Sequence, residues 1–241
     1  MFWNATASVA MVGLGGAAVA ITAMRGESKA IWLTLGYFTA MEGLQAAGYS
    51  VVDQCGSVGN RTITQLSYLH IVFQPLFLNA FAMAIAPVPV PLRMQRRVYA
   101  LASVCSALML LRLAPFDWAG VCTPGTSMCG DAFCTVSGTW HIAWQMPLND
   151  LYGPLSSFVG RTVEFPDYFF AAFLLPLIYG AWRFVLFHLA AGPILAWVLT
   201  SNPDEMPAVW CLFAIGILMI GLSPFIRHSV MGAHRPVAAH A

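Results

Sequence analysis

Charged side chains are scarce in this sequence, and their scarcity excludes an ordinary soluble fold. Asp, Glu, Lys and Arg make up 9% of the 241 residues, whereas 59% are hydrophobic. A soluble domain contains about 25% charged residues, so this chain has too few polar groups to cover its surface in water. Lipid is the solvent that the composition fits, and we predict an integral membrane protein.

Several functional motifs are also missing. The net charge is only +1, and neither a basic patch nor a phosphate-binding glycine loop occurs, so we expect no nucleic-acid partner. The sequence has no H-E-x-x-H motif, no histidine box and no C-x-x-C-H motif for c-type haem. The N-terminal MFWNATASVA lacks the basic stretch of a signal peptide, so we expect the first apolar run to be a retained helix.

The apolar runs that are present suit transmembrane helices, each of which needs roughly 20 residues. The stretch 167–201 is too long for one span, and Gly180 with Arg183 at its middle suits a tight turn. We therefore predict an all-α fold, a single transmembrane domain over residues 1–241 that forms a seven-helix bundle. The helices are expected at about 5–24, 30–50, 64–87, 96–115, 167–182, 185–201 and 207–226.

The placement of charge predicts the orientation, because cytoplasmic loops carry an excess of Lys and Arg. With the N-terminus out and the C-terminus in, a basic set falls inside: Arg25, Lys29, Arg93, Arg96, Arg97, Arg183, Arg227 and Arg235. An acidic set falls outside: Asp53, Asp117, Asp131, Asp150, Glu164, Asp167, Asp204 and Glu205. We expect the functional site to lie on the non-cytoplasmic side of the membrane.

The segment 116–166 is long for a loop, and we expect it to cap the outer face of the bundle. Loops beyond about 15 residues are usually functional or disordered, and this one is rich in aromatic residues. Its apolar stretch Thr139–Leu148 predicts a short interfacial helix. Four cysteines lie in the predicted outer loops: Cys55, Cys122, Cys129 and Cys134. An oxidising compartment favours two disulfides over a zinc site, with three pairings open.

Glu42 is the acid that we place within a hydrocarbon span, where a charge costs about 3 kcal/mol and is functional by default. His70 is expected at the same depth on the next helix, and His141 enters from the cap. Glu and His are ligands of Zn, Fe and Cu, so we predict a transition-metal site of Glu42, His70 and His141. Glu42 and Tyr68 are the predicted catalytic residues. The alternative is a buried polar network around a protonated Glu42.

His70 and His141 begin two similar stretches, H-I-V-F-Q-P-L and H-I-A-W-Q-M-P-L. On a helix, the His and the Gln four residues later share a face. Side chains that would orient the metal ligands by hydrogen bonds are Gln45, Gln74, Asn79, Gln145 and Arg112. Arg112 also suits either a carboxylate clamp or snorkelling to the interface. Other aromatic residues suit an interfacial belt: Trp118, Trp140, Trp144, Trp197 and Trp210.

Four motifs carry a resemblance to a known family: Met41-Glu42-x-x-Gln45, Tyr68-Leu-His70-Ile-x-Phe-Gln74-Pro75, Trp140-His141-Ile-Ala-Trp144 and Pro207-Ala-Val-Trp210-Cys211. With these, the chain is similar to an uncharacterised family of bacterial polytopic membrane proteins, a domain of unknown function. The resemblance covers most of the chain and implies no activity. It implies a protein of the bacterial inner membrane, and the predicted orientation then places the functional site on the periplasmic face.

Three classes of function remain open. The first is a metal-binding membrane enzyme that acts on a lipid-like or small apolar substrate. The second is a proton-coupled transporter or channel that uses Glu42. The third is an accessory or cofactor-binding subunit in which His70 or His141 ligates haem or a pigment. The expected partners are the lipid bilayer, the substrate, and either a second copy of the chain or another subunit of a membrane complex.

Overall fold

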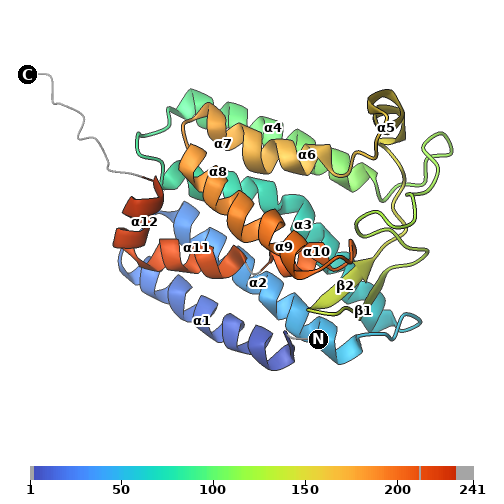
Figure 1. The fold of residues 1–241 in the computed structure, drawn as a ribbon. Helices are drawn as coiled ribbons and strands as arrows, with labels where there is room; N and C mark the ends of the chain where they lie inside the picture. Colours follow the sequence, from blue (N-terminus) through green and yellow to red (C-terminus); the bar gives the residue numbers. More distant parts are fainter. Residues whose placement is uncertain (1–2, 212, 232–241) are drawn as a thin grey trace, which may run out of the picture.

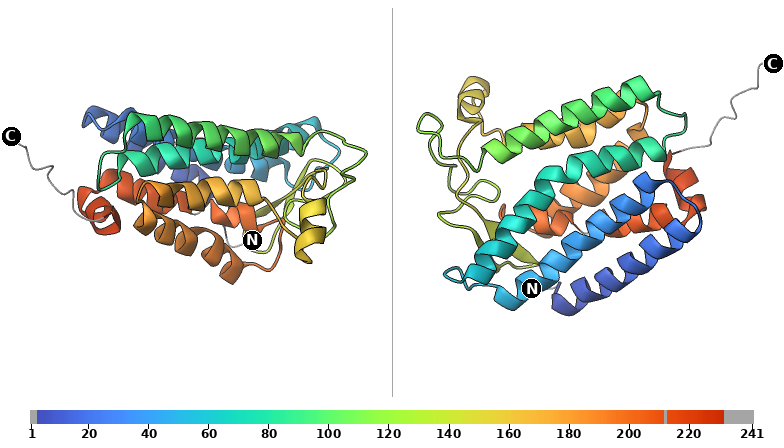
Figure 2. Two further views of the ribbon diagram at one scale, coloured as in Figure 1. Left: turned by 90° about the horizontal axis from the view of Figure 1, so that it is seen from above. Right: turned by 180° about the vertical axis from the view of Figure 1, so that it is seen from behind.

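The computed structural model describes residues 3–211 and 213–231, and within them the chain is mostly helical (Figure 1). Arg235 lies outside the described residues. The first four helices follow the first four apolar runs, at α1 Ala5–Met24, α2 Lys29–Val51, α3 Val58–Ala84 and α4 Leu92–Leu111. Each packs beside the next along the chain, as the view from behind shows (Figure 2). These helices build one wall of the bundle.

The second half of the chain forms shorter helices with π-helical turns inside them. One segment consists of α6 Pro166–Phe169, η1 Phe170–Leu174 and α7 Leu175–Ile178. The next consists of α8 Trp182–Leu189, η2 Ala190–Ile194 and α9 Leu195–Leu199. The predicted turn between them is confirmed at Gly180, whose φ of 84° favours glycine. The chain then forms α10 Met206–Trp210, α11 Phe213–Leu222 and α12 Pro224–Met231.

Within the described residues, three of the helical segments are long and apolar enough to cross a membrane: Ala5–Met24, Val58–Ala84 and Trp182–Leu199. Pro166–Ile178 and Met206–Leu222 are apolar but shorter. The seven-span bundle and its orientation therefore stay predictions.

The two ends of the bundle differ in what closes them (Figure 1). At one end lies the cap, where the backbone N–H of Trp3 donates to the carbonyl of Trp140 over 2.8 Å. At the opposite end, Arg227 of α12 forms an ion pair with Glu27 over 2.9 Å. The cap end contains the residues that position the candidate site.

The cap contains a β-hairpin where we predicted an interfacial helix, so both that helix and the all-α prediction are wrong here. Strands β1 Cys134–Ser137 and β2 Ile142–Gln145 pair antiparallel, with Thr135 opposite Trp144. The β-branched and aromatic residues of both strands favour a pleated, half-buried surface over a helix. The short helix of the cap is instead α5, Gly153–Val159.

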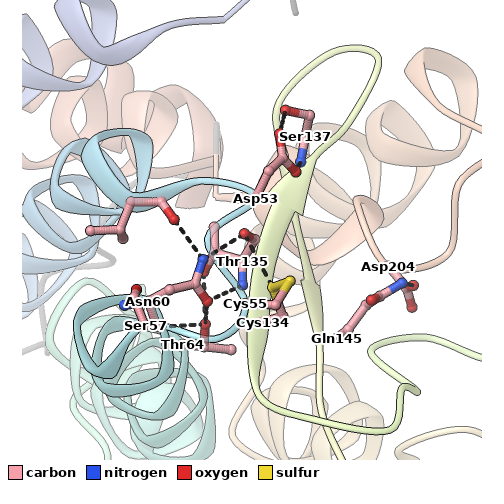
Figure 3. The surroundings of a disulfide bond; sticks show 11 residues. Asp53, Cys55, Ser57, Asn60, Thr64, Cys134, Thr135, Ser137, Gln145 and Asp204 are labelled. Atoms are coloured by element: carbon pink, nitrogen blue, oxygen red, sulfur yellow. Dashed lines mark hydrogen bonds between the residues drawn. A yellow bond between two sulfur atoms is a disulfide. The ribbon is translucent and has the colours of Figure 1, made fainter.

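One disulfide and one asparagine attach the hairpin to the bundle (Figure 3). The predicted pair of disulfides is confirmed, with Cys55 bonded to Cys134 and Cys122 bonded to Cys129. Asn60 of α3 donates to the carbonyl of Thr135 over 2.8 Å and accepts from its N–H over 2.9 Å. This exchange pairs a side-chain amide with the strand backbone, so β1 is fixed to the start of α3.

The structure predicts that the two disulfides differ in their contribution to stability. Cys55 and Cys134 are 79 residues apart, whereas Cys122 and Cys129 are 7 apart. By loop entropy alone, Cys55→Ser with Cys134→Ser costs about 4.5 kcal/mol of unfolding free energy, and Cys122→Ser with Cys129→Ser costs about 2.5 kcal/mol. Denaturant unfolding in detergent measures both double variants. Equal losses would contradict the expectation.

Candidate functional site

Glu42 lies buried between three helices, away from the predicted histidine ligands. Its side chain lines a small gap with Met11 of α1 and with Ala214 and Leu218 of α11. The hydroxyl of Ser8 hydrogen-bonds the carboxyl group. The other oxygen, Oε2, has no hydrogen-bond partner among the described residues.

His70 is held by the helix beside it. Its Nε2 lies 2.7 Å from the carbonyl oxygen of Tyr37, and the two rings stack with centroids 3.9 Å apart. Because a carbonyl only accepts, Nε2 carries a proton and is the donor. A nitrogen that donates this hydrogen bond is not free to bind a metal.

His141 lies in the cap, just before β2, where its Nδ1 accepts from the N–H of Ile142 over 2.8 Å. Its ring stacks on Trp3. Within residues 3–211 and 213–231, no three His, Cys, Asp or Glu side chains come together as a metal site. The structure therefore does not bring Glu42, His70 and His141 to one point, and the metal stays a prediction without geometric support.

The other predicted site residues mostly connect helices. Tyr68 donates to the carbonyl of Met109 over 2.8 Å, and Asn79 donates to the carbonyl of Ala171 over 2.8 Å. Both side chains are fully buried, and their hydrogen bonds link neighbouring helices. Neither side chain lies at a position that supports a catalytic role.

Gln145, Arg112 and Gln45 are likewise engaged by the protein. Gln145 donates to Asp204 over 3.2 Å. Arg112 does not snorkel, because it is only 6% exposed and its guanidinium lies over the ring of Phe165 at 4.2 Å. Gln45 donates to the carbonyl of Ala208 over 3.5 Å, which leaves its Oε1 without a partner among the described residues.

A pocket of about 320 Å³ lies between α3, α6, η2 and α10, below the cap. Of the predicted site residues, it includes Gln74 alone. Most of its wall is apolar and comes from Phe38, Ile71, Met109, Met128, Phe165, Phe169, Pro193, Ala196, Met206, Pro207 and Phe213. A pocket of this size with apolar walls and a few polar groups is typical of small-molecule sites.

A hydrogen bond between Trp210 and His188 forms one polar corner of the pocket. The indole Nε1–H of Trp210 donates to Nε2 of His188 over 3.1 Å. A Cβ at position 192 would lie 2.2 Å from that indole nitrogen, so Gly192 is required for the close approach. Gly192 lies one turn after His188, within the π-helical segment η2. Such π turns occur frequently at functional sites.

Further polar side chains of the pocket wall are Tyr168, Gln74 and Cys211. The hydroxyl of Tyr168 donates to Oε1 of Gln74 over 2.7 Å. Cys211 is outside both disulfides, and its thiol lies 3.3 Å from the carbonyl oxygen of Pro207. At the cap end of the pocket, Glu164 accepts from the N–H of Ser127 over 2.8 Å.

Sequence reasoning missed most of this pocket. Trp210 was assigned to an interfacial belt, and so was Trp144, which is fully buried. Trp118 and Trp197 are 65% and 72% exposed, as a belt requires. The motif Pro207-Ala-Val-Trp210-Cys211 could have indicated the pocket, because it places an aromatic donor and a thiol next to each other.

The burial of His141 predicts a dependence of stability on pH. Burial lowers the pKa of His141 from 6.5 to about 3; the ring faces Tyr49, and the backbone N–H of His141 donates to Glu205. A folded-state pKa below the unfolded value means that the stability contributed by the neutral ring is present above 6.5 and is lost as pH falls toward 3. His141→Asn removes this titration, so its unfolding free energy should fall less than that of the wild type between pH of about 7 and about 4.

Thermal unfolding in detergent, followed by circular dichroism across that pH range, measures the difference in slope. The control is His228→Asn, because His228 is exposed on α12. If His141→Asn and the wild type lose stability in parallel, the buried ring does not contribute in this way.

Comparison with known proteins identifies a family but no activity. The model of the family of unknown function DUF5765 matches residues 6–231. No curated protein matches the chain, and no solved structure matches it. The predicted resemblance to an uncharacterised family is confirmed to that extent, and the bacterial and membrane character of the family stays a prediction.

Proposed function

This chain belongs to the family DUF5765, and we propose that it is a polytopic membrane protein that binds a small apolar molecule inside its helical bundle. The single observation that carries the proposal is the pocket beneath the cap. Its wall combines apolar side chains with the polar groups of His188, Tyr168 and Cys211. Apolar walls supply binding energy for an apolar molecule, and the few polar groups orient it.

The membrane part of the proposal is supported by the surface of the bundle. Large apolar side chains are exposed along it, including Leu14, Val104, Ile178 and Trp197. Apolar surface of this extent is unfavourable in water and favourable in lipid. We propose that all the helical segments of the bundle cross the bilayer, in the seven-span arrangement.

Charge supports the proposed orientation. The end opposite the cap contains Arg25, Arg183 and Arg227, as well as the exposed residues Arg93, Arg96 and Arg97 at the start of α4 (Figure 1). The cap contains Asp117, Asp131, Asp150 and Glu164 together with both disulfides. Basic ends favour the cytoplasm, and disulfides favour an oxidising compartment, so we place the cap in the periplasm.

The pocket also bears on the three classes of function that the sequence left open. It suits the lipid-like or small apolar substrate of a membrane enzyme, and this fit does not depend on a metal. The transport hypothesis depends on Glu42, which faces a different gap. The haem or pigment hypothesis depends on His70 or His141, neither of which lines the pocket. These hypotheses stay predictions, and binding in the pocket is the function that the geometry supports best.

Photolabelling with an alkyl chain that carries a diazirine tests the proposal. Labelled peptides should include α9 and α10, and Ala196→Phe should remove most of that label because it fills the pocket. Ala196→Leu should give an intermediate loss. Ala100→Phe is the matched control, since Ala100 is exposed on α4, away from the pocket. Labelling confined to exposed helix faces, and unchanged in Ala196→Phe, would contradict the proposal.

A further inference from the structure

We propose that the pocket binds an amphiphile with a cationic head group, whose alkyl chain lies among the apolar side chains and whose head group lies at the carboxylate of Glu164. The inference rests on the proposed function and names the class of its ligand. It follows from three features of the pocket: its volume, its opening between two helical segments, and the sign of the charge at its cap end.

The volume of the pocket suits an alkyl chain. The pocket measures about 320 Å³, and one water molecule occupies roughly 30 Å³ in the liquid. A methylene group is similar in size to a water molecule, so the pocket has room for a chain of about ten carbons. Burial of such a chain against the apolar wall supplies the binding energy.

The pocket opens at the side of the bundle, between α6 on one side and η2 with α10 on the other. Phe169 of α6 lines the pocket and is 41% exposed, and the lining residues Pro193 of η2 and Met206 of α10 are half-buried. By contrast, the lining residues Phe38 and Phe213 are buried, so they form the deep end. In the proposed orientation the side opening faces lipid, and a molecule dissolved in the bilayer enters without passing through the cap.

Glu164 places a negative charge on the pocket wall. It is the one charged residue among the described residues that line the pocket. Its Oε2 accepts from the backbone N–H of Ser127 over 2.8 Å, and Ser127 lines the pocket as well, so the two residues meet at the wall through the carboxylate. The side chain of Glu164 is half-buried rather than enclosed, and a head group at the cap end of the pocket therefore reaches it.

No cation of the described protein neutralises this carboxylate. Among the described residues the one ion pair lies at the other end of the bundle. Arg112 does not line the pocket, and its charge interacts with that of Asp167. The carboxylate of Asp204 interacts electrostatically with Glu164 and adds a second negative charge near the cap end. An ammonium head group complements this charge, whereas a carboxylate head group is repelled by it.

Competition with the photolabel described above tests the inference. The probes are decylamine, decan-1-ol and decanoate, which have chains of equal length and carry a positive, a neutral and a negative head group at neutral pH. All are measured with purified protein at one detergent concentration. We expect decylamine to compete best and decanoate worst.

Substitutions assign the preference to Glu164. Glu164→Gln removes the charge and retains an oxygen that accepts from Ser127, so the advantage of decylamine over decan-1-ol should fall about fivefold, the ratio that one partly exposed ion pair supplies. Glu164→Asp retains the charge and should retain a preference for decylamine. Asp117→Asn is the matched control, because Asp117 is an exposed acid of the cap that does not line the pocket. It should leave the preference unchanged.

The competing outcomes are distinct. If decan-1-ol or decanoate competes best in the wild type, or if the preference for decylamine persists unchanged in Glu164→Gln, the inference is wrong. An equal loss in Asp117→Asn also contradicts it, since the preference then comes from the overall charge of the cap. If no probe competes at all, the proposed function itself fails.

The orientation of the bound amphiphile is a second readout, which needs no variant. A decylamine analogue with a diazirine beside the amine should label the peptides 121–131 and 160–166, which contain Ser127 and Glu164. An analogue with the diazirine at the far end of the chain should label peptides that contain Phe38 or Phe213, at the deep end of the pocket. The same labelling pattern from both analogues, or the reverse pattern, would overturn the inference.

Discussion

The buried carboxylate of Glu205 attaches the cap to the helical bundle, and the pocket depends on that attachment. Glu205 is completely buried at the start of α10, where it accepts from the backbone N–H groups of Trp140 and His141 and from the hydroxyl of Thr200. A buried charge is tolerated only when such donors surround it. A Cβ at position 138 would lie 2.6 Å from the carboxyl carbon, so Gly138 provides the space for this approach. One side chain thus joins the hairpin to the loop between α9 and α10.

This attachment divides the molecule into a polar cap and an apolar interior. With β1 fixed through Asn60 and through the Cys55–Cys134 disulfide, the hairpin cannot move away from the helix ends. The loop at Met128 then covers the pocket, and α10 directs Trp210 toward His188.

Composition and periodicity predicted the helices well, because the length and apolarity of a run are local properties of the chain. The turn at Gly180 and the four paired cysteines also followed from local signals. The hairpin did not, because the stretch from Thr139 to Leu148 has an apolar pattern that suits either a helix or a strand, and tertiary contacts of Thr135 and Trp144 decide between them. Its disulfide pairing also depends on that hairpin.

The candidate site was harder to predict, for a physical reason. Glu42, His70 and His141 were grouped by depth, but depth along a helix axis does not fix which face a side chain occupies. The structure directs these three residues to separate neighbours: Ser8, Tyr37 and Ile142. The pocket instead depends on contacts between distant parts of the chain, such as Gln74 with Tyr168, which no short motif encodes.

The most direct test of the account is the position of a bound ligand. Crystals of the protein soaked with a bromoalkane give an anomalous signal at the bromine atom, and this signal locates the bound chain. We predict a bromine inside the pocket, among Met109, Trp210 and Phe213. Bromine found only against the exposed faces of the helices, with the pocket free of ligand density, would contradict the account.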